Sequence, residues 1–338
     1  MFGRYANFWR LDARRDTETG EDRTGKDIEM FSRSRRGGLS GLAALLAAAI
    51  LMALMTVASA AERTAILTAF QPEYDAIRAR MTDVAVRTER GAEYLTGTLG
   101  GREVIVGQTG ISMVNAAMNT QLLIDLHAPK SIIVSGIAGG VNPELKIGDV
   151  AIPAEWSQYL EAVFARREAD GSWSIPPFFR RDVPNYGMIF PKPIAVWRGD
   201  KGAVERLWFD ADPAMLAAAE KAAAEADLRR CGSDGACLEG QPAIRVGGRG
   251  VSGQAFVDNA DFRDYVAGTF QADALDMESA AVAMVAFAND TPFLAVRSMS
   301  DLAGGEPDGN AMGVFFGIAA ENAARTVEAL LRNLPTDR

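Results

Sequence analysis

The chain has 338 residues, of which 48% are hydrophobic, so it is long enough to bury a large core. Its 44 acidic and 35 basic residues give a formal net charge of −9, and such an acidic chain is a poor candidate for binding nucleic acid. The chain has only one histidine, His127, and two cysteines, which nearly excludes a Ser-His or Cys-His nucleophile. These residues form no cluster with metal-ligand spacing, so we expect no metal and no cofactor.

The N-terminal region has the layout of a secretory signal peptide. Three arginines precede an apolar stretch over residues 42–57, and small residues end this stretch at Ala60. The alternative is an uncleaved membrane anchor, because the apolar stretch is nearly long enough to span a bilayer. The small-residue ending favours cleavage after Ala60, which predicts a periplasmic or secreted protein without stable membrane association. Residues 1–29 are polar and show no periodicity, and Met30 is a second candidate start.

Strands and helices alternate through the next part of the chain. A helix is expected at about 72–81, and a second helix begins after Gly110. Four apolar stretches predict buried strands, and they cover residues 63–70, 102–110, 131–140 and 148–156. In the second helix the apolar residues recur at helical spacing; they are Ile111, Val114, Ala117, Met118, Leu122 and Ile124.

The pattern weakens between about residues 158 and 242, where prolines and aromatic residues precede an alanine-rich helix. We interpret residues 158–242 as a large insertion, a lid or an interface element, and not as a separate domain. Cys231 and Cys237 lie in this region, within "CGSDGAC". In an exported chain they predict a local disulfide, and the alternative is two unrelated thiols.

The alternation resumes after the insertion and completes the fold prediction. Strand patterns appear over 243–253 and 292–301, the helix of "ALDMESAAV" lies between them, and an amphipathic helix over about 311–333 closes the chain. This order predicts an α/β fold, a three-layer sandwich with a central, mixed and largely buried sheet. Residues 61–338 are expected to form one domain. They carry 26 basic and 37 acidic residues, a net charge of −11, because nine basic and seven acidic residues fall within 1–60.

Three carboxylates lie at or near the ends of predicted strands. Asp276 suits the N-cap of a helix that begins at Met277, and Glu278 is then free to accept hydrogen bonds from ligand hydroxyls. Asp301 ends the strand of residues 292–301, and its alternative role is to form a turn. Three glycine turns, "GQTGIS", "SGIAGG" and "GVSGQAF", also follow strands and imply ligand-facing loops at the carboxyl ends of the strands.

Five separated motifs resemble one family in the same order. "ALDMESAAVAMVA" followed by "PFLAVRSMSD" is similar to the signature of the nucleoside phosphorylase/nucleosidase superfamily, and most similar to that of the methylthioadenosine/S-adenosylhomocysteine nucleosidases. "GISMVNAAMNTQLLID", "VSGIAGGVNPELKIGDVAIPAE" and "GVSGQAFVDNADFRDY" agree as well. The likeness covers residues 63–156 and 244–333. It implies a purine/uridine phosphorylase-like fold and a homo-oligomer, with a dimer favoured.

The resemblance implies roles for the residues at the sugar and the base. Met277 falls where the family's methionine packs under the ribose, and Glu278 falls where a glutamate binds the ribose hydroxyls. Asp301 matches the catalytic aspartate that donates a proton to N7 of the purine, and Ser300 matches the hydroxyl beside it. Phe256 matches the aromatic residue that stacks on the base.

The resemblance also implies the rest of the site. Val257 matches the residue whose backbone groups face the purine edge, and Ala138 and Gly139 fall in the glycine turn that lines the substrate site. Glu73 matches the glutamate that activates the attacking water. Arg297 matches an arginine that helps to organise the nucleophile site.

Two positions depart from the family pattern. Ile137 stands where the family's "G-[ST]-A-G-G" has a hydroxyl residue, and this loss counts against phosphate binding and leaves the water less well held. The acidic stretch of the first loop is reduced to "FQPEYD", so Glu73 has Asp75 as a competitor.

The chemistry of N-glycosidic cleavage fits these residues without the family. The reaction passes through an oxocarbenium-like sugar, so it needs an acid for the leaving base and a carboxylate on the water side. We therefore expect a hydrolase that releases the base of a purine nucleoside, such as methylthioadenosine, S-adenosylhomocysteine or an external nucleoside. The alternatives are a phosphate-dependent phosphorylase that uses Arg78 and Arg297, and a periplasmic nucleoside-binding protein.

Overall fold

The structure is a computed structural model, and it describes residues 63–179, 183–232 and 235–335. All of these residues belong to one compact unit, Met52–Arg338. The expected signal segment, residues 1–60, lies outside the described residues. Among the helices of the described ranges, none has the length and apolar character that a membrane crossing requires.

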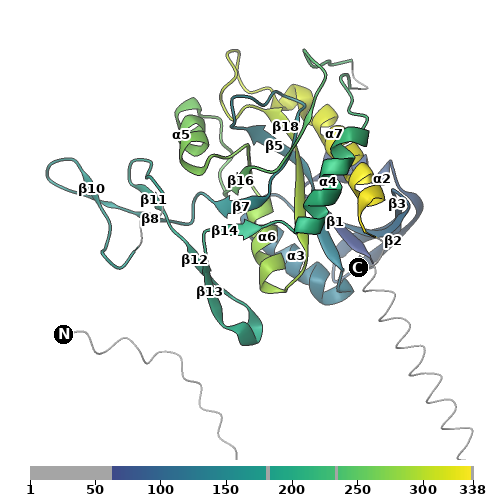
Figure 1. The fold of residues 1–338 in the computed structure, drawn as a ribbon, viewed down its shortest axis with the longest axis horizontal. Coiled ribbons are helices and arrows are strands. Elements are labelled where there is room, and N and C mark those ends of the chain that lie inside the picture. Colours follow the sequence, from purple (N-terminus) through teal and green to yellow (C-terminus); the bar gives the residue numbers. More distant parts are fainter. Residues whose placement is uncertain (1–62, 180–182, 233–234, 336–338) are drawn as a thin grey trace, which may run out of the picture. The chain divides into compact units, whose positions relative to one another are not determined.

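A mixed sheet of 12 described strands forms the centre of the fold (Figure 1). Its middle is parallel, because β5 (Ser131–Gly140) runs parallel to both β1 (Thr64–Thr68) and β18 (Phe293–Asp301). β4 (Arg102–Gln108) extends the parallel part beyond β1, and an antiparallel hairpin forms the edge. The hairpin strands are β2 (Thr82–Glu89) and β3 (Ala92–Leu99).

Two stretches that were expected to be single strands are each divided in two. Residues 148–156 form β6 (Val150–Ile152) and β7 (Glu155–Gln158), which separate at Pro153, a residue with no backbone N–H for a sheet ladder. Residues 243–253 form β15 (Ile244–Val246) and β16 (Arg249–Ser252), which separate at two glycines with positive φ. β16 pairs with β17 (Ala274–Asp276), and β7 pairs with β14 (Trp208–Asp210).

Helices cover both faces of the sheet, which confirms the three-layer prediction. One apolar cluster includes Ile66 of β1, and the opposite cluster includes its neighbours Ala65 and Leu67, so alternate residues of one strand face the two layers. The first layer holds α2 (Gln71–Arg78), α4 (Pro213–Glu225) and α7 (Met312–Asn333). The second layer holds α3 (Met113–His127) and α6 (Ser279–Ala288), and α5 (Ala260–Phe270) packs in a smaller cluster with β16 and β17.

Helix α3 is present as predicted, but part of its apolar spacing faces outwards. Met118 is 61% exposed, and Val114 and the preceding Ile111 are 56% and 50% exposed. The buried side of α3 carries Met113, Ala116, Thr120 and Leu123. Because α3 is apolar on most of its circumference, helical spacing alone does not identify the face that packs on the sheet.

The region expected as an insertion, residues 158–242, has two structurally different parts. Three pairs of short strands form two-stranded sheets of their own and extend from the main sheet in Figure 1. Their strand pairs are β8 (Ala162–Phe164) with β11 (Ile189–Pro191), β9 (Arg166–Arg167) with β10 (Trp173–Ser174), and β12 (Ile194–Trp197) with β13 (Ala203–Arg206). In contrast, β14 joins the main sheet and the alanine-rich α4 packs in the main core. A disulfide joins Cys231 to Cys237, as predicted.

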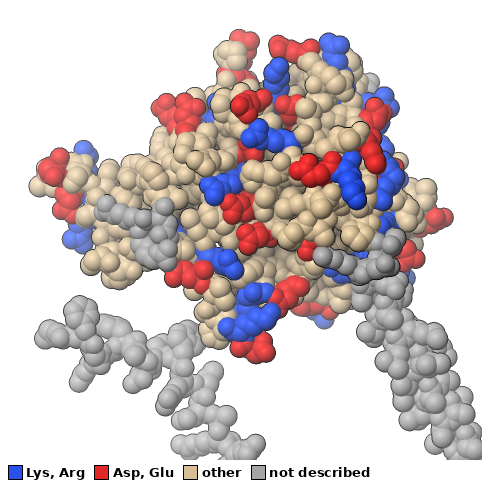
Figure 2. Space-filling model, in the orientation of Figure 1, with Lys and Arg blue, Asp and Glu red and all other residues tan. Residues whose placement is uncertain are grey.

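Charged side chains of both signs are interspersed over the face shown in Figure 2. Ion pairs such as Arg325–Glu321 at 2.8 Å and Arg332–Glu328 at 3.0 Å connect successive turns of α7. Exposed pairs of this kind contribute about 0.3–0.5 kcal/mol each. The fold therefore depends on its two apolar layers, and those layers also fix the strand ends at which the polar residues of the site meet.

Candidate active site

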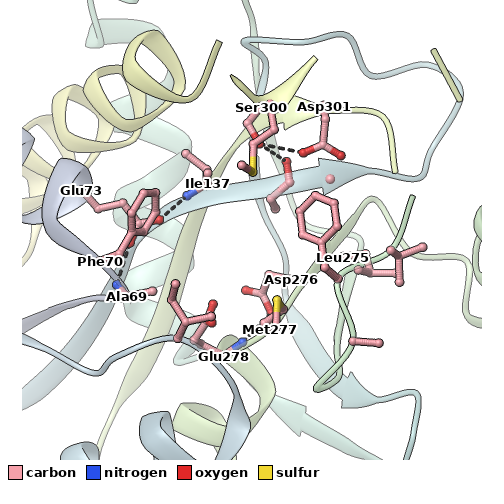
Figure 3. A pocket seen from close by; sticks show the side chains of 17 residues that line it. Ala69, Phe70, Glu73, Ile137, Leu275, Asp276, Met277, Glu278, Ser300 and Asp301 are labelled. Atoms are coloured by element: carbon pink, nitrogen blue, oxygen red, sulfur yellow. Dashed lines mark hydrogen bonds between the residues drawn. The ribbon is translucent and has the colours of Figure 1, made fainter. Parts of the chain in front are cut away.

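A cavity of about 210 Å³ lies where several strands of the sheet end (Figure 3). Its walls come from the ends of β1, β5, β17 and β18 and from the loop after β16. The lining includes nine residues expected in the site: Glu73, Ala138, Gly139, Phe256, Val257, Met277, Glu278, Ser300 and Asp301. It also includes apolar residues that the sequence did not single out, among them Phe70, Leu275 and Met312.

Glu73 is buried at one side of the cavity, on the first turn of α2. Its Oε2 accepts a hydrogen bond from Ala69 N at 2.6 Å, and its Oε1 accepts one from Ile137 N at 2.8 Å. Burial raises the pKa of Glu73, while Arg297 and these N–H groups oppose the rise. The competitor Asp75 is exposed and accepts a hydrogen bond from Gln71, so of the two carboxylates only Glu73 reaches the cavity.

Arg297 lies behind the cavity wall and joins three carboxylates. It is fully buried on β18, and its Nε is 2.7 Å from Asp276 Oδ2. Its Nη2 is 3.4 Å from Glu278 Oε2, and its Nη1 is 3.7 Å from Glu73 Oε1. Burial favours the neutral form of Arg297, but the three carboxylates raise its pKa above the usual value. The guanidinium therefore stays charged and holds the carboxylates in one cluster.

The carboxylates at 276 and 278 differ from the predicted helix start. Asp276 is the last residue of β17, and α6 begins at Ser279 with Glu278 as its N-cap, so Asp276 is not the N-cap of a helix that begins at Met277. Its Oδ1 nevertheless accepts hydrogen bonds from the N–H groups of Glu278 and Ser279, each at 3.2 Å. The prediction failed because β17 has only three residues and continues directly into the helix. Met277 and Glu278 consequently lie in the link between strand and helix, against the cavity.

Glu278 is held from the opposite side by the loop before α3. Its Oε1 accepts a hydrogen bond from Ser112 N at 2.8 Å. Ser112 has φ 84° and ψ 156°, a region that glycine normally occupies, and residues in such regions cluster at functional sites. Burial raises the pKa of Glu278 to about 7, with further upward effects from Asp276 and Glu73 and downward effects from Arg297 and Ser112 N–H. Sequence reasoning missed Ser112, because its contribution is a backbone donor.

Asp301 lies on a different side of the cavity from Glu73, with Ser300 beside it (Figure 3). Its Oδ2 accepts a hydrogen bond from Ser300 Oγ at 2.8 Å, and its Oδ1 accepts one from Ala303 N at 2.9 Å. Burial raises the pKa of Asp301, and these donors lower it. Phe256 also lines the cavity and is 55% exposed, so its ring presents a free face.

Two other residues considered in the sequence lie away from the cavity. His127 packs its ring edge-on against Tyr94 with centroids 4.8 Å apart, and burial lowers its pKa. Arg78 is exposed at the end of α2. Within the described ranges, no group of three or more His, Cys, Asp or Glu side chains is arranged to hold a metal ion.

The arrangement supplies two buried carboxyl groups in different environments on different sides of one cavity. One is next to a hydroxyl and an aromatic ring, and the other is next to a guanidinium and two backbone N–H groups. Carboxyl groups held in different environments can act as acid and base in one reaction. Glu278 lines the same cavity and offers oxygen acceptors to hydroxyl groups of a bound molecule.

Comparison with known proteins agrees with this geometry. The family model of the phosphorylase superfamily matches residues 63–332. The 5'-methylthioadenosine/S-adenosylhomocysteine nucleosidase of Geobacillus kaustophilus is 30% identical over 270 residues, which cover 80% of this chain and 96% of the relative. The enzyme of the same name from a Marinomonas species is 31% identical over 267 residues, or 78% of this chain and 96% of the relative.

A solved structure of a protein with the same name has a similar fold. The 5'-methylthioadenosine/S-adenosylhomocysteine nucleosidase from Neisseria meningitidis, crystallised with methylthio-immucillin-A, is similar with a TM-score of 0.60 and 26% sequence identity. The match covers 81% of this chain and 100% of that chain.

Proposed function

The chain belongs to the phosphorylase superfamily, and from that premise we propose that it is a purine nucleosidase. It hydrolyses the N-glycosidic bond of methylthioadenosine, S-adenosylhomocysteine or a related purine nucleoside and releases the free base. The relatives and the solved structure with that name support this activity over the alternatives. The observation that carries the proposal is the pair of buried carboxyl groups, Glu73 and Asp301, on different sides of one cavity.

Each group has a part in the proposed mechanism. Asp301 donates a proton to N7 of the leaving purine, whose ring stacks on Phe256. Met277 packs under the ribose, and Glu278 accepts hydrogen bonds from its hydroxyls. Glu73 accepts a proton from the attacking water as the oxocarbenium-like sugar forms. The raised pKa values of Asp301 and Glu73 suit both tasks, because a general acid or base is most effective when its pKa is close to the operating pH.

The electrostatics of the site argue against phosphorolysis. The guanidinium of Arg297 is already paired with three carboxyl groups, so it offers little free positive charge to an entering phosphate dianion. Ile137 contributes an apolar side chain to the cavity where a hydroxyl would be needed to bind phosphate. Arg78, the other candidate phosphate ligand, is exposed and does not line the cavity.

A binding protein without catalysis is also disfavoured. Desolvating Glu73 and Asp301 costs free energy that a simple nucleoside receptor would have no reason to spend. Ligand affinity alone is served by Glu278, Phe256 and the apolar walls.

The decisive test is product analysis with a nucleoside panel, in buffer with and without phosphate. We expect free purine and free sugar at equal rates in both buffers. Recovery of a sugar 1-phosphate, with no turnover in the absence of phosphate, would establish the phosphorylase instead. Tight binding without release of base would establish the binding protein.

We further propose that the chain forms a homodimer and acts outside the cytoplasm. The exposed apolar side chains of Val114, Met118 and the adjoining Ile111 support self-association. The signal-like composition of residues 30–60 and the Cys231–Cys237 disulfide support export to an oxidising compartment. Intact-mass analysis of exported protein tests the second point: we expect a mature chain that begins near Ala61, and a full-length chain would contradict export with cleavage.

A further inference from the structure

A second carboxylate is anchored in the same turn as Asp301. Asp301 Oδ1 accepts a hydrogen bond from Ala303 N at 2.9 Å, and Glu306 Oε1 accepts one from Leu302 N at 2.7 Å. Leu302 and Ala303 are neighbours in the chain, so two adjacent peptide N–H groups fix the two carboxyl groups. The turn thus holds both groups close together at the end of β18.

Glu306 has little freedom to turn away from this position. Its Oε1 also accepts a hydrogen bond from Ala311 N at 3.4 Å, and its Oε2 is buried and has no hydrogen-bond partner among the described residues. Backbone hydrogen bonds hold the turn, because Gly305 N donates to Leu302 O at 3.0 Å and Asn259 N donates to Ala303 O at 3.1 Å. An unpartnered carboxylate oxygen in a fixed turn is costly, which points to a role for its charge.

We propose that Glu306 is a positioning residue for the acid, whose carboxylate disfavours the ionised form of Asp301 and so keeps a proton on Asp301 for the leaving purine. The inference rests on the proposed nucleosidase function, in which Asp301 is the general acid. It assigns a role to a residue that no motif in the sequence indicated.

The other groups around Asp301 act mostly in the opposite direction. Ser300 Oγ, Ala303 N and the Asn310 side chain donate hydrogen bonds to Asp301 and lower its pKa, whereas burial and then the Glu306 charge raise it. Without Glu306, burial alone would oppose the three donors, and the proton on Asp301 would be held less firmly.

Two charged residues on neighbouring elements also face this loop. Arg263 of α5 donates from Nε to Gly140 O at 3.2 Å. Its guanidinium packs against Gly305, since a Cβ on Gly305 would lie 3.0 Å from it. Asp258, in the loop before α5, accepts a hydrogen bond from Asn310 Nδ2 at 3.3 Å. Arg263 also lies 3.7 Å from Asp264 Oδ1, so part of its charge is paired, whereas Glu306 is the carboxylate fixed in the acid's own turn and raises the pKa of Asp301.

The proposal makes a prediction about the alkaline limb of the pH profile. A general acid works while it is protonated, so base release falls as the pH rises through the pKa of Asp301. Removal of the negative charge at 306 lowers that pKa and moves the limb to lower pH. We expect Glu306→Gln to shift the alkaline limb of kcat/KM down by roughly 0.5–1 pH unit, a loss of about 3- to 10-fold above the limb, with little change at acidic pH.

The experiment compares three proteins over about pH 5 to 9 with one nucleoside. Glu306→Gln keeps an oxygen for Leu302 N, and the matched control is Asp308→Asn, which removes one acidic charge from an exposed position in the same loop. The wild type supplies the reference limb. We expect a shift for Glu306→Gln and none for Asp308→Asn.

Other outcomes overturn the proposal. An unshifted limb for Glu306→Gln, a uniform loss at every pH, or an equal shift in Asp308→Asn would each show that Glu306 does not act on the acid through its charge. Failure of the nucleosidase function is distinguishable, because in that case the wild type itself releases no base, or Asp301→Asn releases base as fast as the wild type.

Discussion

Gly136 has no side chain at the point where a carboxylate and a guanidinium meet. A Cβ on this residue would lie 2.2 Å from Glu73 Oε1 and 2.4 Å from Arg297 Nη1. Both contacts are shorter than any real Cβ contact, and Gly136 lies inside β5, where hydrogen bonds to β18 fix the backbone. The missing methyl group is therefore what allows Glu73 to reach the backbone N–H of Ile137.

We expect Gly136→Ala to displace Glu73 and lower turnover by about 10²-fold, the typical cost of moving a catalytic group by roughly 1 Å. Nucleoside affinity should change less, because the atoms nearest to the new methyl group belong to Glu73 and Arg297 and not to Phe256, Met277 or Glu278. Steady-state kinetics together with calorimetric binding checks this expectation. Gly240→Ala is the control, since a Cβ there meets no atom within 4 Å. Normal turnover in a folded Gly136→Ala protein would contradict the proposed role of Glu73.

Glu278 makes the stability of the empty protein depend on pH. Burial raises its pKa from 4.5 to about 7, so between these values the folded protein holds a proton that the unfolded chain has released. The contribution is fully present below the unfolded pKa and is lost as the pH rises through the folded pKa, at about 1.4 kcal/mol per pH unit.

Glu278→Gln should remove this dependence. From pH 5 to pH 8 we expect the free energy of unfolding of the wild type to fall by roughly 2–3 kcal/mol more than that of the variant. Urea unfolding at both pH values measures the difference, and titrating groups outside the Arg297 cluster cancel in the comparison. Equal losses in the two proteins would show that Glu278 is ionised throughout this range.

At the scale of elements, local pattern predicted most strands and helices but not their joints. The buried strand at 131–140 and the helix at 311–333 were predicted almost to the residue, because long apolar or amphipathic stretches are unambiguous. Pro153 divided one expected strand, and the helix expected to begin at Met277 begins at Ser279, after a three-residue β17. Where one element ends and the next begins depends on which neighbouring strand supplies the backbone hydrogen bonds. That neighbour is distant in the sequence, so a local pattern does not reveal it.

The region expected as an insertion shows the same limit. Its alanine-rich helix, α4, carries little amphipathic contrast, yet Met215, Ala219 and Ala222 pack in the main core. Among the described strands of this region, only the pairs between β7 and β14 form sheets separate from the main sheet. Composition alone did not distinguish the part that completes the core from the part that extends beyond it.

The disulfide stabilises one short element of this region. Cys231 and Cys237 are six residues apart. The next residue, Leu238, packs closely against Gly148, since a Cβ on Gly148 would lie 2.2 Å from the Leu238 side chain. The bridge closes a small loop, so we expect the double variant Cys231→Ser/Cys237→Ser to lose at most about 2–4 kcal/mol of unfolding free energy. Denaturant titration of both proteins measures the loss. Two freely alkylatable thiols in the untreated wild type would contradict the bridge.

At the scale of the whole molecule, the sheet order brings together residues that lie far apart in the sequence. Glu73 and Asp301 meet because β1, β5 and β18 run parallel and end at the same edge. Glu278 joins them from β17, which pairs antiparallel with the end of β5 at Gly139 and Gly140. The motifs indicated which residues belong to the site. The sequence indicated Arg297 at the nucleophile site but not its ion pairs with three carboxylates, which depend on distances across the sheet. It contained no signal for Glu306, whose place depends on the fold of a turn.

The exposed apolar face of α3 bears on how the protein assembles. Val114 and Met118 are more than half exposed on this helix, and the half-exposed Ile111 beside them also lines the cavity. Burying a large apolar side chain contributes roughly 1.5–3 kcal/mol, so pairing two such faces would stabilise a dimer and cover the cavity rim at Ile111.

We therefore expect the wild type to be a dimer in light scattering after size exclusion and Met118→Glu to be a monomer. Two glutamates in an apolar interface would be desolvated without a partner, which is costly enough to separate the subunits. The monomer should also show a raised KM, because the cavity rim at Ile111 is then open to water. Val86→Glu is the control, since Val86 is 51% exposed on the edge strand β2, and it should remain dimeric. If Met118→Glu stays dimeric while Val86→Glu dissociates, the interface lies at the β2 edge and the α3 face has another use.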